Sequence, residues 1–343
     1  MSGETTQANL QANGEPRPVT GVSSDATRGA TSHASSTDAR LRVAVIGATG
    51  LLGRPVYEAL AQDPRYIVTG TAFTRARAGL VTLDVTNAGA VETFFASYRP
   101  QAVILTAAER RPDVCEQDPV AAHALNVGAV EIVARLAQAQ QAWMLSISTD
   151  YVFDGSAAPY RPDSMPHPLN AYGRGKLEGE RALAGALDHA CVLRLPLLYG
   201  PLTDTGESAA TSFLPALERA TSAQPAVIDD WAIRYPTYTP DVADVIAQLV
   251  ERVAHAKPVV GIHHWSGDEA MTKYDIALAL AERLGIDSEC IRAQSSPADA
   301  TPRPYDCHLD SASLVSLGIG KRTPFATGLD TVLARLAGLA TDV

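Results

Sequence analysis

The sequence of 343 residues predicts an α/β fold, with a doubly wound parallel sheet followed by a smaller C-terminal domain. From Leu41 to about residue 148, short apolar runs of strand length alternate with segments whose apolar residues recur at helical spacing. This alternation is typical of a parallel sheet, because right-handed crossovers carry the helices over both of its faces. After Tyr199 the pattern loosens, and Gly, Pro, Asp and Thr become frequent.

The elements follow in a regular order. LRVAVIG at 41–47 predicts a strand, and LLGRPVYEALAQ at 51–62 has the apolar spacing of a helix. The same reasoning predicts the strands YIVTGTAF (66–73) and GLVTLDV (79–85), the helix AVETFFASY (90–98), the strand AVILTAA (102–108), the helix PVAAHALNVGAVEIVARLAQAQ (119–140) and the strand WMLSIS (143–148). The helices TPDVADVIAQLVERVA (239–254) and TKYDIALALAERLG (272–285) are assigned to the smaller region. The expected domains are residues 40–200 and 201–343, the second partly interleaved with the first.

Residues 1–39 are rich in Ser, Thr, Ala, Gly, Asn and Gln and carry almost no large apolar side chains. Such a segment cannot bury enough apolar surface to fold, so it is expected to be a disordered tail. A mitochondrial transit peptide is the alternative, but it is disfavoured because the segment contains Glu4, Glu15, Asp25 and Asp38 and has no amphipathic period.

Charge and cysteine content narrow the class of partner. The net charge is −10 and the pI is near 5.3, whereas a nucleic acid or an anionic membrane requires a basic surface. The four cysteines (Cys115, Cys191, Cys290 and Cys307) form no C-x-x-C pair and have no metal-ligand spacing. The charge therefore predicts no nucleic-acid or membrane partner, and the cysteine spacing predicts no metal site. The N-terminus also lacks the charged-then-apolar order of a secretory signal, so we expect a cytoplasmic protein.

The first candidate site is GATGLLG at 47–53, which follows a predicted strand and opens a predicted helix. In that context Gly47 allows a tight turn, Gly50 allows close approach of a pyrophosphate, and Gly53 allows the helix to pack against the strand. The helix N-terminus would offer N–H groups to the phosphates of a dinucleotide. The alternative is a glycine turn without a ligand.

The residues after the next strand indicate which dinucleotide binds. An acidic residue would normally hold the ribose 2′-hydroxyl of NAD there, but GTAFTRAR supplies Arg75 and Arg77 instead. A guanidinium pairs well with a 2′-phosphate, so NADP is favoured over NAD; a solvated arginine loop is the alternative. Asp84, at the end of the third predicted strand, is expected within reach of the adenine amino group.

The second candidate site is the pair Tyr172 and Lys176 in NAYGRGKLEGE at 170–180, which reads as the start of a helix. A lysine at i+4 lies on the same helical face, and its charge is expected to lower the pKa of the phenol. The tyrosine would then give a proton to a carbonyl oxygen while a nicotinamide delivers hydride. Ser148 and Thr149 emerge from the strand WMLSIS at the ligand-binding edge, where Thr149 is expected beside Tyr172; a capping hydroxyl is the alternative.

Other residues carry weaker signals. His263 and His264 are adjacent on a strand and therefore point to opposite faces, so a structural role is favoured over metal binding. Trp265 and Tyr274 are expected in the core, and Trp231, near Arg234, is a candidate for the pocket wall. Arg110 and Arg111 follow the strand AVILTAA, where an anionic ligand and a solvated loop are comparable alternatives.

GATGLLG, STDYVFDG at 148–155 and YGRGK at 172–176 resemble, in that order, the extended short-chain dehydrogenase/reductases and, among them, the dTDP-4-dehydrorhamnose reductase group. The resemblance covers about residues 41–325 and implies a Rossmann fold with a smaller substrate-type domain. It implies a catalytic set of Thr149, Tyr172 and Lys176. It also implies cofactor contacts from Gly47, Thr49, Gly50, Leu51, Leu52, Gly53, Arg75, Arg77, Asp84, Ala107, Ala108, Tyr172 and Lys176.

A closer resemblance is to the regulatory (beta) subunits of methionine adenosyltransferase. It rests on AAERRPDV at 107–114, LRLPLLYG at 193–200, ESA at 207–209, DDWAIRYPT at 229–237, HWSGDEAMTKY at 264–274 and LGIGKRTPF at 317–325. That family implies an NADP-binding regulator in S-adenosylmethionine biosynthesis, with the catalytic (alpha) subunit as its partner. The alternative is an NADPH-dependent reductase of a nucleotide-linked keto sugar, so whether the chain is itself an enzyme stays open at this point.

Overall fold

Seven parallel strands form the main sheet of the computed structural model, which describes residues 40–75, 77–297 and 301–341. The strand order across the sheet is β10-β6-β5-β4-β1-β2-β3. The strands are β1 (Leu41–Ile46), β2 (Tyr66–Ala72), β3 (Val81–Thr82), β4 (Ala102–Leu105), β5 (Trp143–Thr149), β6 (Ala190–Leu195) and β10 (Gly261–His264). This is the predicted doubly wound sheet, and its strand order reverses between β1 and β4, where such folds bind ligands.

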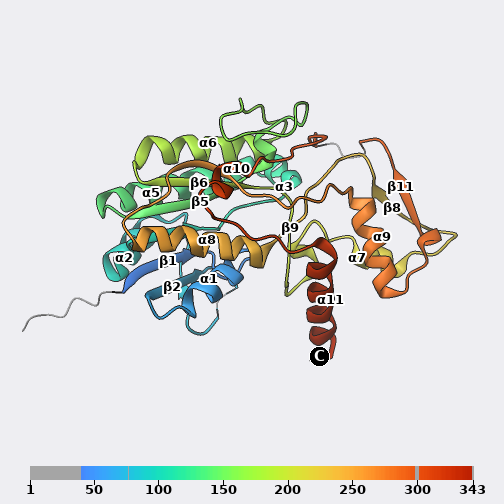
Figure 1. The fold of residues 1–343 in the computed structure, drawn as a ribbon, viewed down its shortest axis with the longest axis horizontal. Coiled ribbons are helices and arrows are strands. Elements are labelled where there is room, and N and C mark those ends of the chain that lie inside the picture. Colours follow the sequence, from blue (N-terminus) through green and yellow to red (C-terminus); the bar gives the residue numbers. More distant parts are fainter. Residues whose placement is uncertain (1–39, 76, 298–300, 342–343) are drawn as a thin grey trace, which may run out of the picture. The chain divides into compact units, whose positions relative to one another are not determined.

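Helices cover both faces of this sheet (Figure 1). The helices of the described residues are α1 (Gly53–Ala61), α2 (Ala88–Tyr98), α3 (Pro112–Gln117), α4 (Pro119–His123), α5 (Ala129–Ala139), α6 (Ala171–Ala186), α7 (Leu214–Arg219), α8 (Thr239–Ala254), α9 (Lys273–Leu284), α10 (Ala312–Val315) and α11 (Phe325–Thr341). Strand β1 shows how the faces separate, because Val43 and Val45 pack with α1 and α8, while Ala44 and Ile46 pack with α2 and α5. Successive side chains of a strand point to opposite faces, so an apolar run buried on both sides is expected here.

Helix α8 and strand β10 belong to the sheet rather than to the smaller region. Val242, Ile246 and Leu249 of α8 lie in the same buried cluster as Val56 of α1, and β10 pairs in parallel with β6. Residues 239–254, which are expected in the smaller region, pack on the sheet, so the C-terminal segment interleaves with the sheet at this helix. An amphipathic pattern indicates that one helix face is buried but does not indicate against which partner.

The predicted long helix at 119–140 is divided into three parts. Helix α4 runs into a π-helical segment, Ala124–Gly128, and then into α5. The stretch Pro119–Ala139 is long and apolar enough to cross a membrane by length and composition alone. However, Val130, Val133 and Ala137 are buried in the sheet core, as in a core helix of a globular protein.

The smaller region is built from α7, α9, α11 and the two-stranded sheet of β8 (Ala226–Asp229) and β11 (Ile291–Gln294). In Figure 1, α7, α9, β8 and β11 gather to the right of the main sheet. A cluster including Leu214, Ile276, Leu280 and Leu329 forms its core, with Tyr274 packed at its edge. A second two-stranded sheet pairs β7 (Leu198–Tyr199) with β9 (Thr237–Tyr238).

Two further expectations concern the ends of elements. The strand expected at 79–85 is only two residues long, and Asp84 lies beyond it in a turn, where its carboxylate accepts hydrogen bonds from Thr86 N and Oγ1 at 2.9 and 2.6 Å. The tail predicted at 1–39 lies outside the described residues.

Candidate functional site

The glycine loop 47–53 joins β1 to α1 at the switch point of the sheet. Gly47 has φ of +95°, and a Cβ on it would lie 2.8 Å from Thr106 Oγ1 and 2.9 Å from Ala107 N, which follow β4. A Cβ on Gly53 would lie 2.0 Å from the carbonyl oxygen of Gly47. Only glycine fits at these two positions, so the loop is closed tightly against the end of β4.

The loop has the features that a dinucleotide pyrophosphate requires. A Cβ on Gly50 would meet only the oxygen of Gly47, at 3.4 Å, so the outer side of Gly50 is open. Among the described residues, no side chain caps the N-terminus of α1. The N–H groups of Leu51, Leu52 and Gly53 at this helix end are suited to hold phosphate oxygens. The residues present therefore fit a bound dinucleotide.

Arg75, the candidate for the 2′-phosphate, lies in the loop after β2, and its side chain is 51% exposed. Its Nη1 forms an ion pair with Glu207, which also accepts two hydrogen bonds from Arg54 of α1, at 3.1 and 2.6 Å. Arg77 is exposed in the same loop. Burial raises the pKa of Glu207, but hydrogen bonds from Arg54 and Thr203 outweigh it and lower the pKa to about 2.

Tyr172 and Lys176 lie in the first turns of α6, on the side that faces the sheet. Asn170 caps this helix, because its side chain accepts a hydrogen bond of 2.9 Å from Gly173 N. A Cβ on Gly173 would lie 2.2 Å from the carbonyl oxygen of Tyr151, so the glycine between the pair lets α6 approach the end of β5. This close approach places Tyr172 against Tyr151, with ring centres 5.9 Å apart, and close to Thr149.

The electrostatics of the pair differ from expectation. Burial raises the pKa of Tyr172, although the nearby hydroxyl of Thr149 opposes this, and burial lowers the pKa of Lys176 to about 8. The net shift of the Tyr172 pKa is therefore upward, because desolvation dominates, and Lys176 is not among its main causes. At neutral pH, Tyr172 is a protonated phenol, which is the form that can donate a proton.

Thr149 ends β5 and begins a short polar turn. Its Oγ1 donates to Asp150 Oδ1 at 3.0 Å and accepts from Tyr151 N at 3.2 Å. Asp150 is 5% exposed, and burial raises its pKa to about 6 against the opposing effects of Arg234 and Thr149. The capping role weighed for Thr149 is thus present, together with its contact to Tyr172.

Ser148 points away from this turn and into a buried ionic network. Its hydroxyl donates to Glu180, which lies one turn after Lys176 on α6 and pairs with Arg194 of β6 at 2.7 Å. Arg194 also lies 3.4 Å from His264 Nε2, and His264 Nδ1 lies 3.2 Å from the oxygen of Tyr160. Burial lowers the pKa of His264 to about 3, so its ring is neutral.

Asn126, which the sequence reading overlooked, supports the loop after β4. Its side chain accepts from Glu109 N at 3.0 Å and donates to Glu109 O at 2.9 Å. It lies in the π-helical segment, and such segments often occur at functional sites, but this signal is present only in the structure. Arg111 pairs with Glu109, and Arg110 donates to Gly206 O at 2.8 Å, while both residues are exposed.

The segment after β8 carries Trp231 and Arg234, and Arg234 lies close to the turn after β5. Arg234 is 3% exposed, and its guanidinium carbon lies 5.7 Å from the centre of the Tyr151 ring. Its Nη2 has no hydrogen-bond partner among the described residues. Trp231 lies against Tyr305, with ring centres 5.2 Å apart. Trp265, in contrast, is fully buried in the sheet core, as predicted.

His263 hydrogen-bonds Ser313 and the oxygen of Val260, whereas His264 belongs to the buried network of Arg194. No group of three metal-ligating side chains occurs among the described residues. The two histidines therefore have separate structural contacts, on opposite sides of β10.

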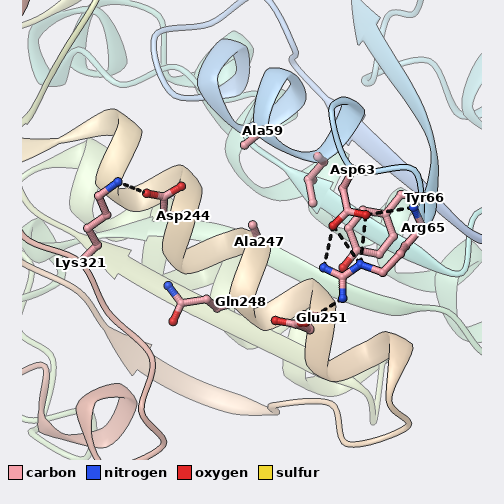
Figure 2. Close-up of a pocket in the computed structure, with 10 residues that line it drawn as sticks. Ala59, Asp63, Arg65, Tyr66, Asp244, Ala247, Gln248, Glu251 and Lys321 are labelled. Atoms are coloured by element: carbon pink, nitrogen blue, oxygen red, sulfur yellow. Dashed lines mark hydrogen bonds and ion pairs between the residues drawn. The ribbon is translucent and has the colours of Figure 1, made fainter.

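A separate hollow of about 240 Å³ lies between α1 and α8 (Figure 2). Arg65 crosses it, pairing with Asp63 at 2.6 Å and with Glu251 of α8 at 2.7 Å, while Lys321 pairs with Asp244. The buried hydroxyl of Tyr66 at its wall has no hydrogen-bond partner among the described residues. None of the predicted site residues lines this hollow. The ion pair between Arg65 and Glu251 joins the loop after α1 to α8.

The fold agrees with comparisons to known proteins. The sequence model of the family described as RmlD substrate binding domain matches residues 41–337. The chain belongs to the RmlD family. The match spans both the sheet and the smaller region.

Two curated relatives of this RmlD-family chain have different names and different levels of sequence identity. Methionine adenosyltransferase 2 subunit beta of Xenopus tropicalis is 43% identical over 289 residues, which cover 84% of this chain and 86% of the relative. A dTDP-4-dehydrorhamnose reductase of Aggregatibacter actinomycetemcomitans is 32% identical over 241 residues, covering 70% and 78% of the two chains. The chain is thus more similar to the first relative than to the reductase.

Solved structures share the RmlD-type fold. The dTDP-4-dehydrorhamnose reductase of Bacillus anthracis, in complex with NADP, aligns with a TM-score of 0.71 and 22% identity, covering 86% of this chain and 98% of that one. The UDP-glucose 4-epimerase of Thermus thermophilus, in complex with NAD, aligns with a TM-score of 0.74 and 21% identity, covering 87% and 99%. At these identities the likeness shows the fold alone.

Proposed function

We propose that this chain is an NADP-binding regulatory subunit of a methionine adenosyltransferase, acting in S-adenosylmethionine biosynthesis in the cytoplasm. The observation that carries this proposal is the 43% identity to a methionine adenosyltransferase 2 subunit beta over 86% of its length. The aligned 289 residues make up 84% of this chain, so the similarity is not confined to the glycine loop and the sheet around it. The proposed partner is the catalytic (alpha) subunit.

Co-expression with a methionine adenosyltransferase catalytic subunit tests this proposal. We expect the two chains to elute together in gel filtration and the kinetics of the catalytic subunit to change. Separate elution with unchanged kinetics would contradict the regulatory role.

A second candidate function is NADPH-dependent reduction of a nucleotide-linked keto sugar. It is favoured by the arrangement of Thr149, Tyr172 and Lys176, and by the 32% identity to a dTDP-4-dehydrorhamnose reductase. The cofactor would supply hydride to the carbonyl carbon. Tyr172, protonated at neutral pH, would donate the phenolic proton to the carbonyl oxygen. Thr149 would orient that oxygen by turning its O–H, which is donated to Asp150 here, toward it. The partly desolvated ammonium of Lys176 would stabilise the phenolate left behind.

The decay of NADPH absorbance with a dTDP-4-keto-6-deoxy sugar tests the second candidate. We expect turnover by the wild-type chain and its loss in Tyr172→Phe, which removes the transferable proton but keeps the ring. No turnover at high protein concentration would exclude this activity and leave the regulatory proposal standing.

The choice of NADP over NAD is proposed to depend on Arg75. Because a guanidinium can bind a phosphate with two N–H donors, Arg75→Ala is expected to weaken NADPH binding by roughly tenfold or more and NADH binding much less. Isothermal titration of both dinucleotides measures this. Arg161→Ala, at an exposed ion pair outside the site, is the control. Equal weakening of NADPH and NADH by Arg75→Ala would refute the role of Arg75.

A further inference from the structure

We propose that Glu207 sets the preference of the dinucleotide site for a 2′-phosphate by holding Arg75 in its binding position. This inference rests on the proposed binding of NADP. It assigns a specificity-determining role to a buried carboxylate that lies in the loop after β7, far along the chain from the glycine loop.

The first step is the anchoring of Glu207. Its side chain is 8% exposed and pairs with Arg54, which is itself 10% exposed. Arg54 is fixed in turn, because its Nη1 donates to Thr49 O at 2.8 Å and its Nη2 to Pro201 O at 3.2 Å. Since Thr49 lies inside the glycine loop, the carboxylate is attached directly to the segment that would hold the pyrophosphate.

The second step is how the donors are shared between the two carboxylate oxygens of Glu207. Glu207 Oε2 accepts from Arg54 Nη2 at 2.6 Å and from Thr203 N at 3.1 Å. Oε1 accepts from Arg54 Nη1 and from Thr203 Oγ1, both at 3.1 Å, and also from Arg75 Nη1. Glu207 would therefore stay fully paired without Arg75, whereas Arg75 gains a fixed position from Glu207.

The third step is what this contact does to Arg75. The side chain of Arg75 is half exposed, and a free arginine would lose rotamer freedom on binding a phosphate. Glu207 takes one hydrogen of Nη1 and leaves most of the five N–H donors for a ligand. A guanidinium that is already ordered binds its ligand more tightly, because the ordering cost falls on the free protein.

The charge of the group is compatible with this role. Arg54, Arg75 and Glu207 together carry one net positive charge, so the cluster attracts an anion even though it contains a carboxylate. A ribose 2′-hydroxyl would gain little from an ordered guanidinium, while a 2′-phosphate would gain charge-assisted hydrogen bonds. The effect is therefore expected on NADPH and not on NADH.

Isothermal titration of the full chain with NADPH and NADH tests the inference, with Glu207→Gln as the main variant. The glutamine keeps the shape and one acceptor oxygen for Arg54 but loses the charge that holds Arg75. We expect NADPH binding to weaken about tenfold, the order of magnitude for releasing one immobilised side chain, and NADH binding to change less than about twofold. Asp163→Asn, at an exposed ion pair, should alter neither affinity.

A double-mutant cycle separates positioning from a general structural effect. In the Arg75→Ala background, Glu207→Gln should cause no further change in the ratio of the NADPH and NADH affinities, because the residue it positions is gone. A thermal unfolding curve of each variant reports the fold independently. If Glu207→Gln does not fold, Glu207→Asp, which keeps the charge but shortens the reach toward Arg75, is expected to show the same selective loss.

The outcomes are distinguishable. A wild-type chain that binds neither dinucleotide, or binds both equally, contradicts the proposed NADP binding itself. A wild-type chain that prefers NADPH, with an unchanged ratio or tighter NADPH binding in the Glu207 variants, overturns the role of Glu207 alone. If Glu207→Gln changes the ratio of the NADPH and NADH affinities equally in the wild type and in the Arg75→Ala background, the role of Glu207 is overturned as well.

Discussion

At Gly53, an added methyl carbon would lie 2.0 Å from the carbonyl oxygen of Gly47. We expect Gly53→Ala to lower the free energy of unfolding by about 1–3 kcal/mol, the usual range for overpacking, because backbone atoms must move. Dinucleotide binding should be lost with it. Urea denaturation and NADPH titration measure the two effects.

Gly185, in the last turn of α6, is the matched control. A Cβ there would meet nothing within 4 Å, so Gly185→Ala should leave binding intact and raise stability by up to about 1 kcal/mol. Equal behaviour of the two alanine variants would contradict the steric account of Gly53.

Asp150 gives a prediction about pH. Its folded-state pKa is raised from 3.8 to about 6, mainly by burial, so the folded chain binds more protons than the unfolded chain between these values. The contribution of Asp150 to stability therefore falls as the pH rises from about 4 to about 6 and is constant above. As the pH rises across this window, the urea midpoint of Asp150→Asn should increase relative to that of the wild type. A gap between the two chains that does not vary with pH would contradict the raised pKa.

For single residues, the sequence predicts a functional role where that role depends on a short continuous segment. Gly47, Gly53, Tyr172 and Lys176 could be recognised because their spacing follows from one turn or one helix. Glu207 could not be recognised from the same reasoning, because its partners lie 132 and 153 residues away and only the fold brings them together. The pKa direction of Tyr172 was also out of reach, since it depends on burial.

Helix α6 is joined to the sheet by a buried ion pair. Arg194 of β6 is 1% exposed and Glu180 of α6 is 5% exposed, and two hydrogen bonds connect them. Glu180→Gln leaves the charge of Arg194 uncompensated, so we expect a loss of about 3–5 kcal/mol in the free energy of unfolding. Chemical denaturation measures it.

The exposed pair of Arg161 and Asp163 provides the comparison. Both side chains are about 70% exposed, so Asp163→Asn should change stability by less than about 1 kcal/mol. A similar small change for Glu180→Gln would show that the buried pair adds little to the attachment of α6.

Most elements were predictable from apolar spacing, and their packing partners were not. The strands at 41–46, 102–105 and 143–149 and the helix at 239–254 stand where the sequence places them. The placement of α8 on the sheet, beside α1, depends on a surface formed by residues that are far away in the chain. The π-helical break at Ala124–Gly128 has no periodic signal of its own in the sequence.

The main sheet and the smaller region should respond to the dinucleotide together. Binding to the folded state alone raises its stability by about 2.7 kcal/mol when the ligand is at 100 times its dissociation constant. Because Leu51 of the glycine loop packs against the core of the smaller region, we expect NADPH to slow hydrogen exchange in α9 and β11 as well as in the sheet. Protection confined to the sheet would show that the two regions open independently.

The position of β10 has a consequence for the newly made chain on the ribosome. This strand completes one edge of the sheet through pairing with β6, yet its residues, 261–264, lie about three quarters of the way along the sequence. The helix α8, which covers α1, is also synthesised late. Until both emerge, β6 has an unpaired edge and the face of α1 stays open, so the early strands cannot reach their final packing as they are made. Folding of the main sheet must therefore wait until most of the chain has been synthesised. A chain interrupted before about residue 265 would expose surface prone to aggregation.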